Sequence, residues 1–136
     1  MRPAPAEILL DLVLFGARGG RFGVEARQVL ACRTVEGDEA PLRVEVLLGL
    51  AEAPSSPRAR QVLRVGSPSS GLEVSVEGPV EFRSLAAASV HPLPPLLAAR
   101  TRLHGLRALA VTEAGMLPLV ELREQGSAGV TGADGP

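Results

Sequence analysis

The sequence predicts a single, mainly β domain of the small barrel or sandwich type, and three observations support this. About seven short segments have strand-like patterns, and turn signals recur every 8 to 12 residues or so. Hydrophobic residues make up 46% of the 136 residues, enough for a packed core. Aromatic residues are only 2%, so the core must be built from Val, Leu, Ala and three Phe, which suit tight sheets.

An apolar hairpin opens the predicted domain. Residues 8–15 form an apolar run broken only by Asp11, which is typical of a buried strand. Residues 16–20, Gly-Ala-Arg-Gly-Gly, supply turn residues that tolerate positive φ. Residues 21–24 then begin a second strand, so the two segments predict a β-hairpin.

The hydrophobic period changes after this hairpin. Across residues 25–33 the apolar stripe predicts one or two helical turns, because its members fall at i, i+3, i+4 and i+7: Ala26, Val29, Leu30 and Arg33. Residues 36–41 are a loop by composition, residues 42–50 are apolar and end at Gly49-Leu50, and residues 53–57 form another turn.

Alternation returns in the middle of the chain. Residues 60–65 alternate as a strand, and residues 66–71 are a Gly/Ser/Pro turn. Residues 72–77 show the cleanest two-residue period, which predicts a strand with one face in water. Gly78-Pro79 interrupts the pattern before it resumes in residues 80–83, and this predicts a bend or bulge, since proline cannot donate to the ladder.

The C-terminal third predicts a final hairpin. Residues 91–95 (His-Pro-Leu-Pro-Pro) are expected to be extended, because residues that precede proline avoid the α region. Residues 96–102 are a candidate short helix. Residues 106–111 and 116–122 form two strands joined by a Thr-Glu-Ala-Gly turn.

The expected organisation is one domain between two tails. Residues 1–6 are expected to be loose, residues 7–124 to form the domain, and residues 125–136 to be disordered. No stretch approaches the roughly 18 apolar residues of a membrane span, and the N-terminus lacks a signal-peptide pattern. A cytoplasmic location is therefore expected.

Charge and composition exclude several classes of partner. The net charge is −1, and all 14 basic residues are Arg. Such a chain has no broad positive field for nucleic acid and no polybasic patch for a membrane surface. We therefore expect no nucleic-acid binding and no direct membrane insertion.

Catalytic and metal chemistry find little support. His91 and His104 lie 13 residues apart, with the lone Cys32 far upstream, which does not give zinc-ligand spacing. Cys32 follows an apolar helical pattern and is expected to be a buried small hydrophobe, unable to form an internal disulfide. The chain has no Lys, so its glycines form no phosphate loop. We expect no catalytic residue, no cofactor and no metal, and a small enzyme is the least favoured reading.

Two features could contact a partner. Residues 92–95 match Pro-x-x-Pro, which can dock in aromatic grooves, although a stiff connector between subdomains is favoured. Four arginines could line an interface, where the guanidinium fork pairs with carboxylates, although scattered arginines are more often simply solvated: Arg27, Arg43, Arg58 and Arg60.

The order of segments resembles the CheW-like family of bacterial chemosensory coupling proteins. Its opening strand ending in Phe, tight turn, Phe-Gly-Val and short helix match residues 12–15, 19–24 and 26–30. Its later strand, Pro-x-Pro stretch, Leu-x-Gly and closing hairpin match residues 74–80, 91–95, 103–106 and 117–122. The match covers roughly residues 7 to 124, and the ordered series is more specific than any single motif.

The middle of the chain departs from the family pattern. Of the central Gly-Val-x-Asn-Leu-Arg-Gly signature only Leu48-Gly49-Leu50 resembles the start, and the chain contains no Asn. Two strands are expected to be missing or collapsed into residues 53–57. The resemblance therefore implies two small packed β-barrel subdomains, one of them truncated, with one or two short helices.

The resemblance implies a non-catalytic adaptor of a chemosensory array. Its partners would be the signalling tip of a methyl-accepting chemoreceptor, and possibly a CheA-type histidine kinase or another CheW-like protein. Kinase docking is expected to be weakened by the shortened middle. The alternative is a structural assembly or sorting factor that does not bind the kinase. Candidate partner-binding residues follow from the matched motifs: Arg27, Val29, Leu30, Arg43, Leu48 and Leu50.

Overall fold

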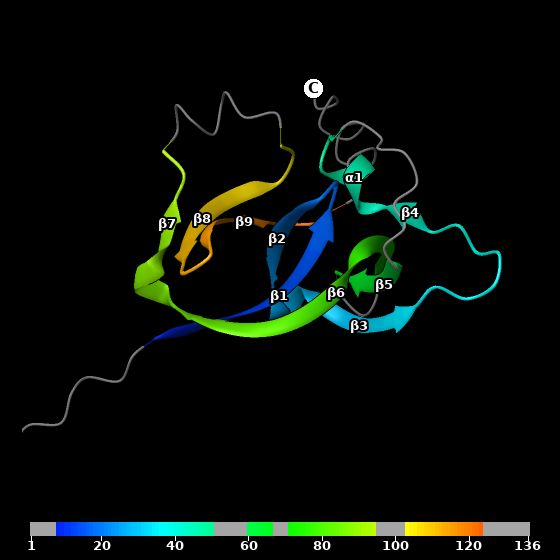
Figure 1. Ribbon diagram of the computed structural model, residues 1–136, viewed down its shortest axis with the longest axis horizontal. Coiled ribbons are helices and arrows are strands. Elements are labelled where there is room, and N and C mark those ends of the chain that lie inside the picture. Colours follow the sequence, from blue (N-terminus) through cyan, green and yellow to red (C-terminus); the bar gives the residue numbers. More distant parts are fainter. Residues whose placement is uncertain (1–7, 51–59, 67–70, 95–102, 124–136) are drawn as a thin grey trace, which may run out of the picture.

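The computed structural model describes residues 8–50, 60–66, 71–94 and 103–123, and it is mainly β with one short α-helix (Figure 1). This confirms the mainly β part of the predicted class. The elements are β1 (Leu9–Ala17), β2 (Gly20–Glu25), the 3₁₀ turn η1 (Ala26–Gln28), β3 (Val29–Thr34), β4 (Leu42–Arg43), α1 (Val44–Leu47), β5 (Arg60–Val65), β6 (Leu72–Ala86), the 3₁₀ turn η2 (Ala87–Ser89), β7 (Val90–Pro92), β8 (Leu106–Thr112) and β9 (Gly115–Val120).

All the described strands belong to one nine-stranded sheet. Its main path is β3-β5-β6-β1-β2-β9-β8-β7, and β4 pairs in parallel with β6 beside that path. The β2–β9 pair is also parallel, at Gly23 and Leu119, and the remaining pairs are antiparallel. No pairing among the described residues joins the end strands β3 and β7, so the pairing leaves this sheet open and does not show the expected barrel subdomains.

The predicted N-terminal hairpin is confirmed. β1 and β2 pair antiparallel down to Ala17 opposite Gly20. The two residues between them have positive φ, 52° at Arg18 and 81° at Gly19. This is the conformation of a two-residue type I′ turn, whose twist matches that of the flanking strands.

β1 lies between two hydrophobic clusters, and this explains why its sequence is an almost continuous apolar run. Side chains alternate across a strand, so odd-numbered residues of β1 enter one cluster and even-numbered residues enter the other. The larger cluster includes Val13, Phe15 and Ala17 with residues of β2, α1, β5 and β6. The smaller cluster comprises Leu12, Leu14, Ala110, Leu117 and Leu119.

The predicted irregularity at Gly78-Pro79 is confirmed as a bulge within one long strand. Leu14 lies opposite Glu81 and Gly16 lies opposite Glu77, so Phe15 alone faces three residues of β6. The Gly78–Pro79 peptide bond is cis. At this bulge the first half of β6, which pairs with β5, passes into the second half, which pairs with β1.

The helix expected over residues 25–33 is mostly wrong. Only Ala26–Gln28 form a 3₁₀ turn, and Val29–Thr34 form β3, paired with β5. A nine-residue segment is too short to distinguish the hydrophobic period of a helix from that of a strand. Pairing with a neighbouring strand decided the conformation, with a register shift between Val29 and Ala31.

The water-exposed face expected for residues 72–77 is confirmed only at Glu73, which is exposed. Ser75 and Glu77 are each only 3% exposed, because β4, α1 and the β1–β2 turn cover that side of β6. The final hairpin is confirmed as β8 and β9. The expectations for residues 1–6, 53–57, 96–102 and 125–136 lie outside the described residues. No helix among the described residues is long and apolar enough to cross a membrane.

Candidate functional site

A groove of about 340 Å³ opens where β2 and β9 part. These strands pair in parallel at Gly23 and Leu119, and a Cβ at position 23 would approach Leu119 Cδ2 to 2.9 Å, so glycine permits this close contact. Because the pair is parallel, the residues that follow each strand run to the same side and line the groove. The lining residues are Leu10, Glu25, Arg27, Gln28, Val90, Arg107, Ala108, Leu119, Val120 and Glu121.

The groove combines apolar side chains with charged ones. On one side, Arg27 Nε lies 3.0 Å from Glu25 Oε1; the Arg27 side chain is largely exposed and the Glu25 side chain is partly exposed. On the other side, Glu121 binds Arg107 and, at 2.7 Å, Arg123. Hydrogen bonding from Arg123 lowers the pKa of Glu121; partial burial opposes this shift, and Arg107 adds to it. An apolar floor beside exposed ion pairs is suited to an amphipathic partner.

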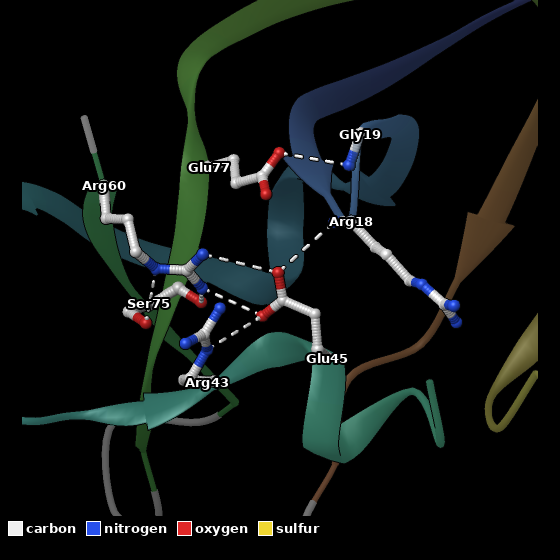
Figure 2. A network of polar contacts seen from close by, with 7 residues as sticks. All are labelled: Arg18, Gly19, Arg43, Glu45, Arg60, Ser75 and Glu77. Carbon is white, nitrogen blue, oxygen red and sulfur yellow. Dashed lines mark hydrogen bonds and ion pairs between the residues drawn. The ribbon is translucent and has the colours of Figure 1, made fainter. Parts of the chain in front are cut away.

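A second polar cluster lies inside the protein, beside the larger hydrophobic cluster (Figure 2). Glu45 of α1 is fully buried and accepts two hydrogen bonds from Arg60, at 2.9 and 3.3 Å. Arg43 Nε lies 3.7 Å from the same carboxylate. Arg60 also donates to the hydroxyl and to the carbonyl oxygen of Ser75, at 3.1 and 2.8 Å. We call Glu45, Arg43, Arg60 and Ser75 the internal network.

The β1–β2 turn is attached to this region through its backbone. The Arg18 amide donates to Glu45 Oε2 and the Gly19 amide donates to Glu77 Oε1, both at 3.3 Å (Figure 2). Two buried carboxylates therefore hold the turn against α1 and β6. Residues from four distant segments meet here, which fixes their relative positions.

The electrostatics favour an ionised Glu45. Burial by itself raises the pKa of this carboxyl, but hydrogen bonds from Arg60 and from its own backbone, with the charges of Arg60 and Arg43, outweigh burial. The resulting pKa lies below its usual value. A buried carboxylate held ionised by guanidinium groups is a poor proton acceptor, so Glu45 serves as a structural element.

The remaining reactive side chains are dispersed. Within the part of the chain that the structure describes, no group of three or more His, Cys, Asp or Glu could hold a metal ion. Cys32 is exposed on β3, so its predicted burial is wrong, and partial desolvation raises the pKa of its thiol. His91 and His104 are also exposed, and the ring of His104 packs against Gly49.

The structure divides the six expected partner-binding residues among different surroundings. Arg27 lines the groove, and its side chain is 82% exposed. Leu30 is 38% exposed on β3, outside the groove lining, and Val29 is half-buried against the larger cluster. Arg43 belongs to the internal network, Leu48 is buried in the larger cluster, and Leu50 packs against it. The structure does not bring them together as one surface.

The sequence does not predict the roles of several residues of the groove and of the internal network. Arg107 and Glu121 lie on the closing hairpin and its exit, where the cross-strand register, unseen in the sequence, brings them together. Glu45 lies in an apolar segment, and a lone acidic residue flanked by valines was a usable signal for a buried charge. The sequence places Arg60 among the candidate interface arginines, whereas in the structure it completes the internal network.

Comparison with known proteins identifies the fold. Neither a family model nor a curated protein matches the sequence. The crystal structure of the scaffolding protein TtCheW from Thermoanaerobacter tengcongensis is similar, with a TM-score of 0.64 at 15% identity over 85% of this chain and 91% of that chain. The chain therefore has a CheW-like fold, as the order of its sequence motifs predicts.

Proposed function

We propose that the protein is a non-catalytic adaptor of a bacterial chemosensory array, located in the cytoplasm. It would bind the signalling tip of a methyl-accepting chemoreceptor, a sister coupling protein, or both. The observation that carries this proposal is the CheW-like fold, which extends over 85% of the chain. The order of the sequence motifs supports the same assignment independently of the coordinates.

The groove supplies the docking surface in this proposal. Its floor is apolar, with Leu10, Val90 and Ala108, and its charged side chains are exposed ion pairs. A receptor tip built of amphipathic helices could lay its apolar stripe on this floor. Its charged flanks could exchange ion pairs with Arg27 and Glu121 at little net cost, because exposed pairs contribute only about 1 kcal/mol or less.

We propose further that docking of a CheA-type kinase is weakened. The family's central signature is reduced to Leu48-Gly49-Leu50, so the surface that the central strands build would be incomplete. The fold would then consist of two small barrels, one of them truncated, and the two hydrophobic clusters on either side of β1 support such a division. A shortened coupler of this type would suit the short second CheW-like protein of the Frz pathway.

Titration calorimetry with three purified ligands tests the proposal: a receptor-tip fragment, a kinase regulatory domain and a full-length CheW-like coupler. Binding to the receptor tip, with or without the coupler, and with the kinase domain at least tenfold weaker, is the expected result. Equal affinity for all three would indicate a complete coupler. Binding to the coupler alone would favour an assembly or sorting factor, and binding to none would refute the adaptor assignment.

A matched pair of charge reversals locates the surface. Arg27→Glu replaces an exposed groove arginine and should weaken receptor-tip binding about tenfold, which corresponds to about 1.4 kcal/mol. Arg18→Glu makes the same change in the exposed β1–β2 turn, outside the groove lining, and should leave the affinity unchanged. If both variants bind like the wild type, the groove is not the docking surface.

A further inference from the structure

The second half of β6 has a free edge. Residues 81–86 pair with β1 on one side, whereas the pairing with β5 ends at Glu77 opposite Arg60. Among the described residues no strand pairs with the other side of this half. Figure 1 shows β6 running along the lower border of the molecule beside β1. An unpaired strand edge can recruit another strand.

The side chain of Gln61 shows which backbone groups point outward. Gln61 Oε1 accepts a hydrogen bond of 3.3 Å from the backbone N–H of Val80, so that N–H points away from β1. Backbone direction alternates along a strand, so Phe82 and Ser84 present their N–H and C=O groups to the same free edge. Pro79 is an odd-numbered position, so its nitrogen does not face this edge. Its missing N–H therefore leaves the edge uninterrupted.

Phe82 stands at the centre of the free edge with 67% of its surface exposed. The other two phenylalanines, Phe15 and Phe22, stack inside the larger cluster with ring centroids 5.9 Å apart. An aromatic side chain exposed beside unpaired backbone groups is the usual anchor of a strand-to-strand contact. The monomer contains no described element that covers it.

The charges beside Phe82 are self-complementary. Glu81 and Arg83 flank it and project to the opposite face of β6. Glu81 binds Arg21 at 3.2 Å in an exposed pair, while Arg83 makes no ion pair with any described residue. If a second β6 runs antiparallel with Phe82 opposite its own copy, each Glu81 faces the other chain's Arg83. This charge pattern selects a second copy of the chain as the occupant.

We propose that the protein self-associates through antiparallel β6–β6 pairing centred on Phe82. Residues 80, 82 and 84 then exchange backbone hydrogen bonds with residues 84, 82 and 80 of the second copy, which matches the parity of the free edge. The hydrogen bond between the Val80 N–H and the Gln61 side chain breaks. The two Phe82 rings then pack against each other on one face of the joined sheets. The contact is isologous and closes as a dimer rather than a fibre. This proposal goes beyond the adaptor function and does not depend on it.

Sedimentation velocity over a concentration series tests the proposal. The wild type should show a monomer–dimer equilibrium in the micromolar range. Arg83→Glu and Glu81→Arg should each weaken dimerisation about tenfold or more, and the double variant should recover it, because the swap restores complementarity. Glu113→Arg, an exposed charge reversal in the β8–β9 turn, should have no effect. A wild type that stays monomeric up to millimolar concentration would overturn the proposal.

A cysteine pair tests the register. In a Cys32→Ser background, Phe82→Cys should form an interchain disulfide, because hydrogen-bonded antiparallel partners have Cα atoms about 5.5 Å apart. Ser84→Cys should not, since in this register the two copies of residue 84 lie four residues apart along the strands, about 14 Å at roughly 3.4 Å per residue. Cross-linking at 84 but not at 82 would contradict the register. Arg27→Glu should leave the dimer intact, which separates this proposal from the groove.

Discussion

Two clusters in this protein have the same composition and opposite surroundings. In the internal network Glu45 is bound by Arg60 and Arg43, and the carboxylate is fully buried. At the groove Glu121 is bound by Arg107 and Arg123, and both arginines are mostly exposed. Each cluster joins one carboxylate to two guanidinium groups. Burial alone therefore separates their roles.

The difference shows where a binding function can lie on this fold. A buried ion pair must be satisfied internally, since loss of one partner leaves an uncompensated charge in a poorly polarisable interior. An exposed pair already exchanges with water, so a partner's charges can replace one member at little cost. The internal network accordingly fixes the fold, and the groove cluster is free to bind.

The largest expected effect is the loss of the internal carboxylate charge. Glu45→Gln leaves Arg60 without its charged partner and should lower the free energy of unfolding by about 3 kcal/mol. Glu121→Gln, the matched change at the groove, should lower it by less than about 1 kcal/mol. Urea denaturation of both variants measures the difference. Equal losses would remove the distinction between the clusters.

A backbone change at the groove should have an intermediate effect. Gly105 has φ of 80°, and a Cβ there would overlap the carbonyl oxygen of Glu121. The Glu121 amide also donates to the Gly105 carbonyl at 2.9 Å. Gly105→Ala should therefore lower the free energy of unfolding by about 2 kcal/mol. Thermal or urea denaturation measures this change. A neutral result would show that this side of the groove adapts easily.

Acid should unfold the protein partly through Glu45. Its folded-state pKa is depressed, because the Arg60 and Arg43 contacts outweigh burial, so the unfolded chain takes up the proton first as the pH falls. The stabilisation is complete above the unfolded pKa of about 4.3 and is lost as the pH falls through the folded pKa. Glu45→Gln should flatten stability against pH below about pH 5; an unchanged slope would show that other carboxyls dominate.

The smallest expected effect concerns Leu30, which lies outside the internal network and outside the groove. It is one of the residues that the family resemblance suggests for partner binding, and it is partly exposed on β3. Leu30→Asp should reduce receptor-tip affinity severalfold while circular dichroism shows a folded domain. If affinity is unchanged, the contact is confined to the groove. If the domain unfolds, Leu30 has a packing role.

Much of the sheet could be predicted because its strands carry local signals. Alternation identifies β5 and β6, the glycines identify the β1–β2 turn, and Gly78-Pro79 identifies the bulge. The continuous apolar run of β1 follows from burial on both faces. These features depend on residues close together in the chain.

The candidate site could be predicted only in small part, because it depends on distant pairings. Ser75 and Glu77 have the pattern of a solvated face, yet α1 and the β1–β2 turn cover them. Nothing in the sequence indicates that Gly23 pairs with Leu119 and so opens the groove. Arg27 was identified from its place in the matched motif, and the structure shows that it lines the groove.

Stability and binding depend on different clusters of this protein, and one paired measurement tests this separation directly. Calorimetric titration of a receptor-tip fragment is compared for the wild type, Glu45→Gln and Arg27→Glu, which reverses an exposed charge at the groove. Glu45→Gln should bind with unchanged affinity at a temperature where it is folded, and Arg27→Glu should lose about tenfold in affinity while retaining its stability. The reverse pattern would contradict the account.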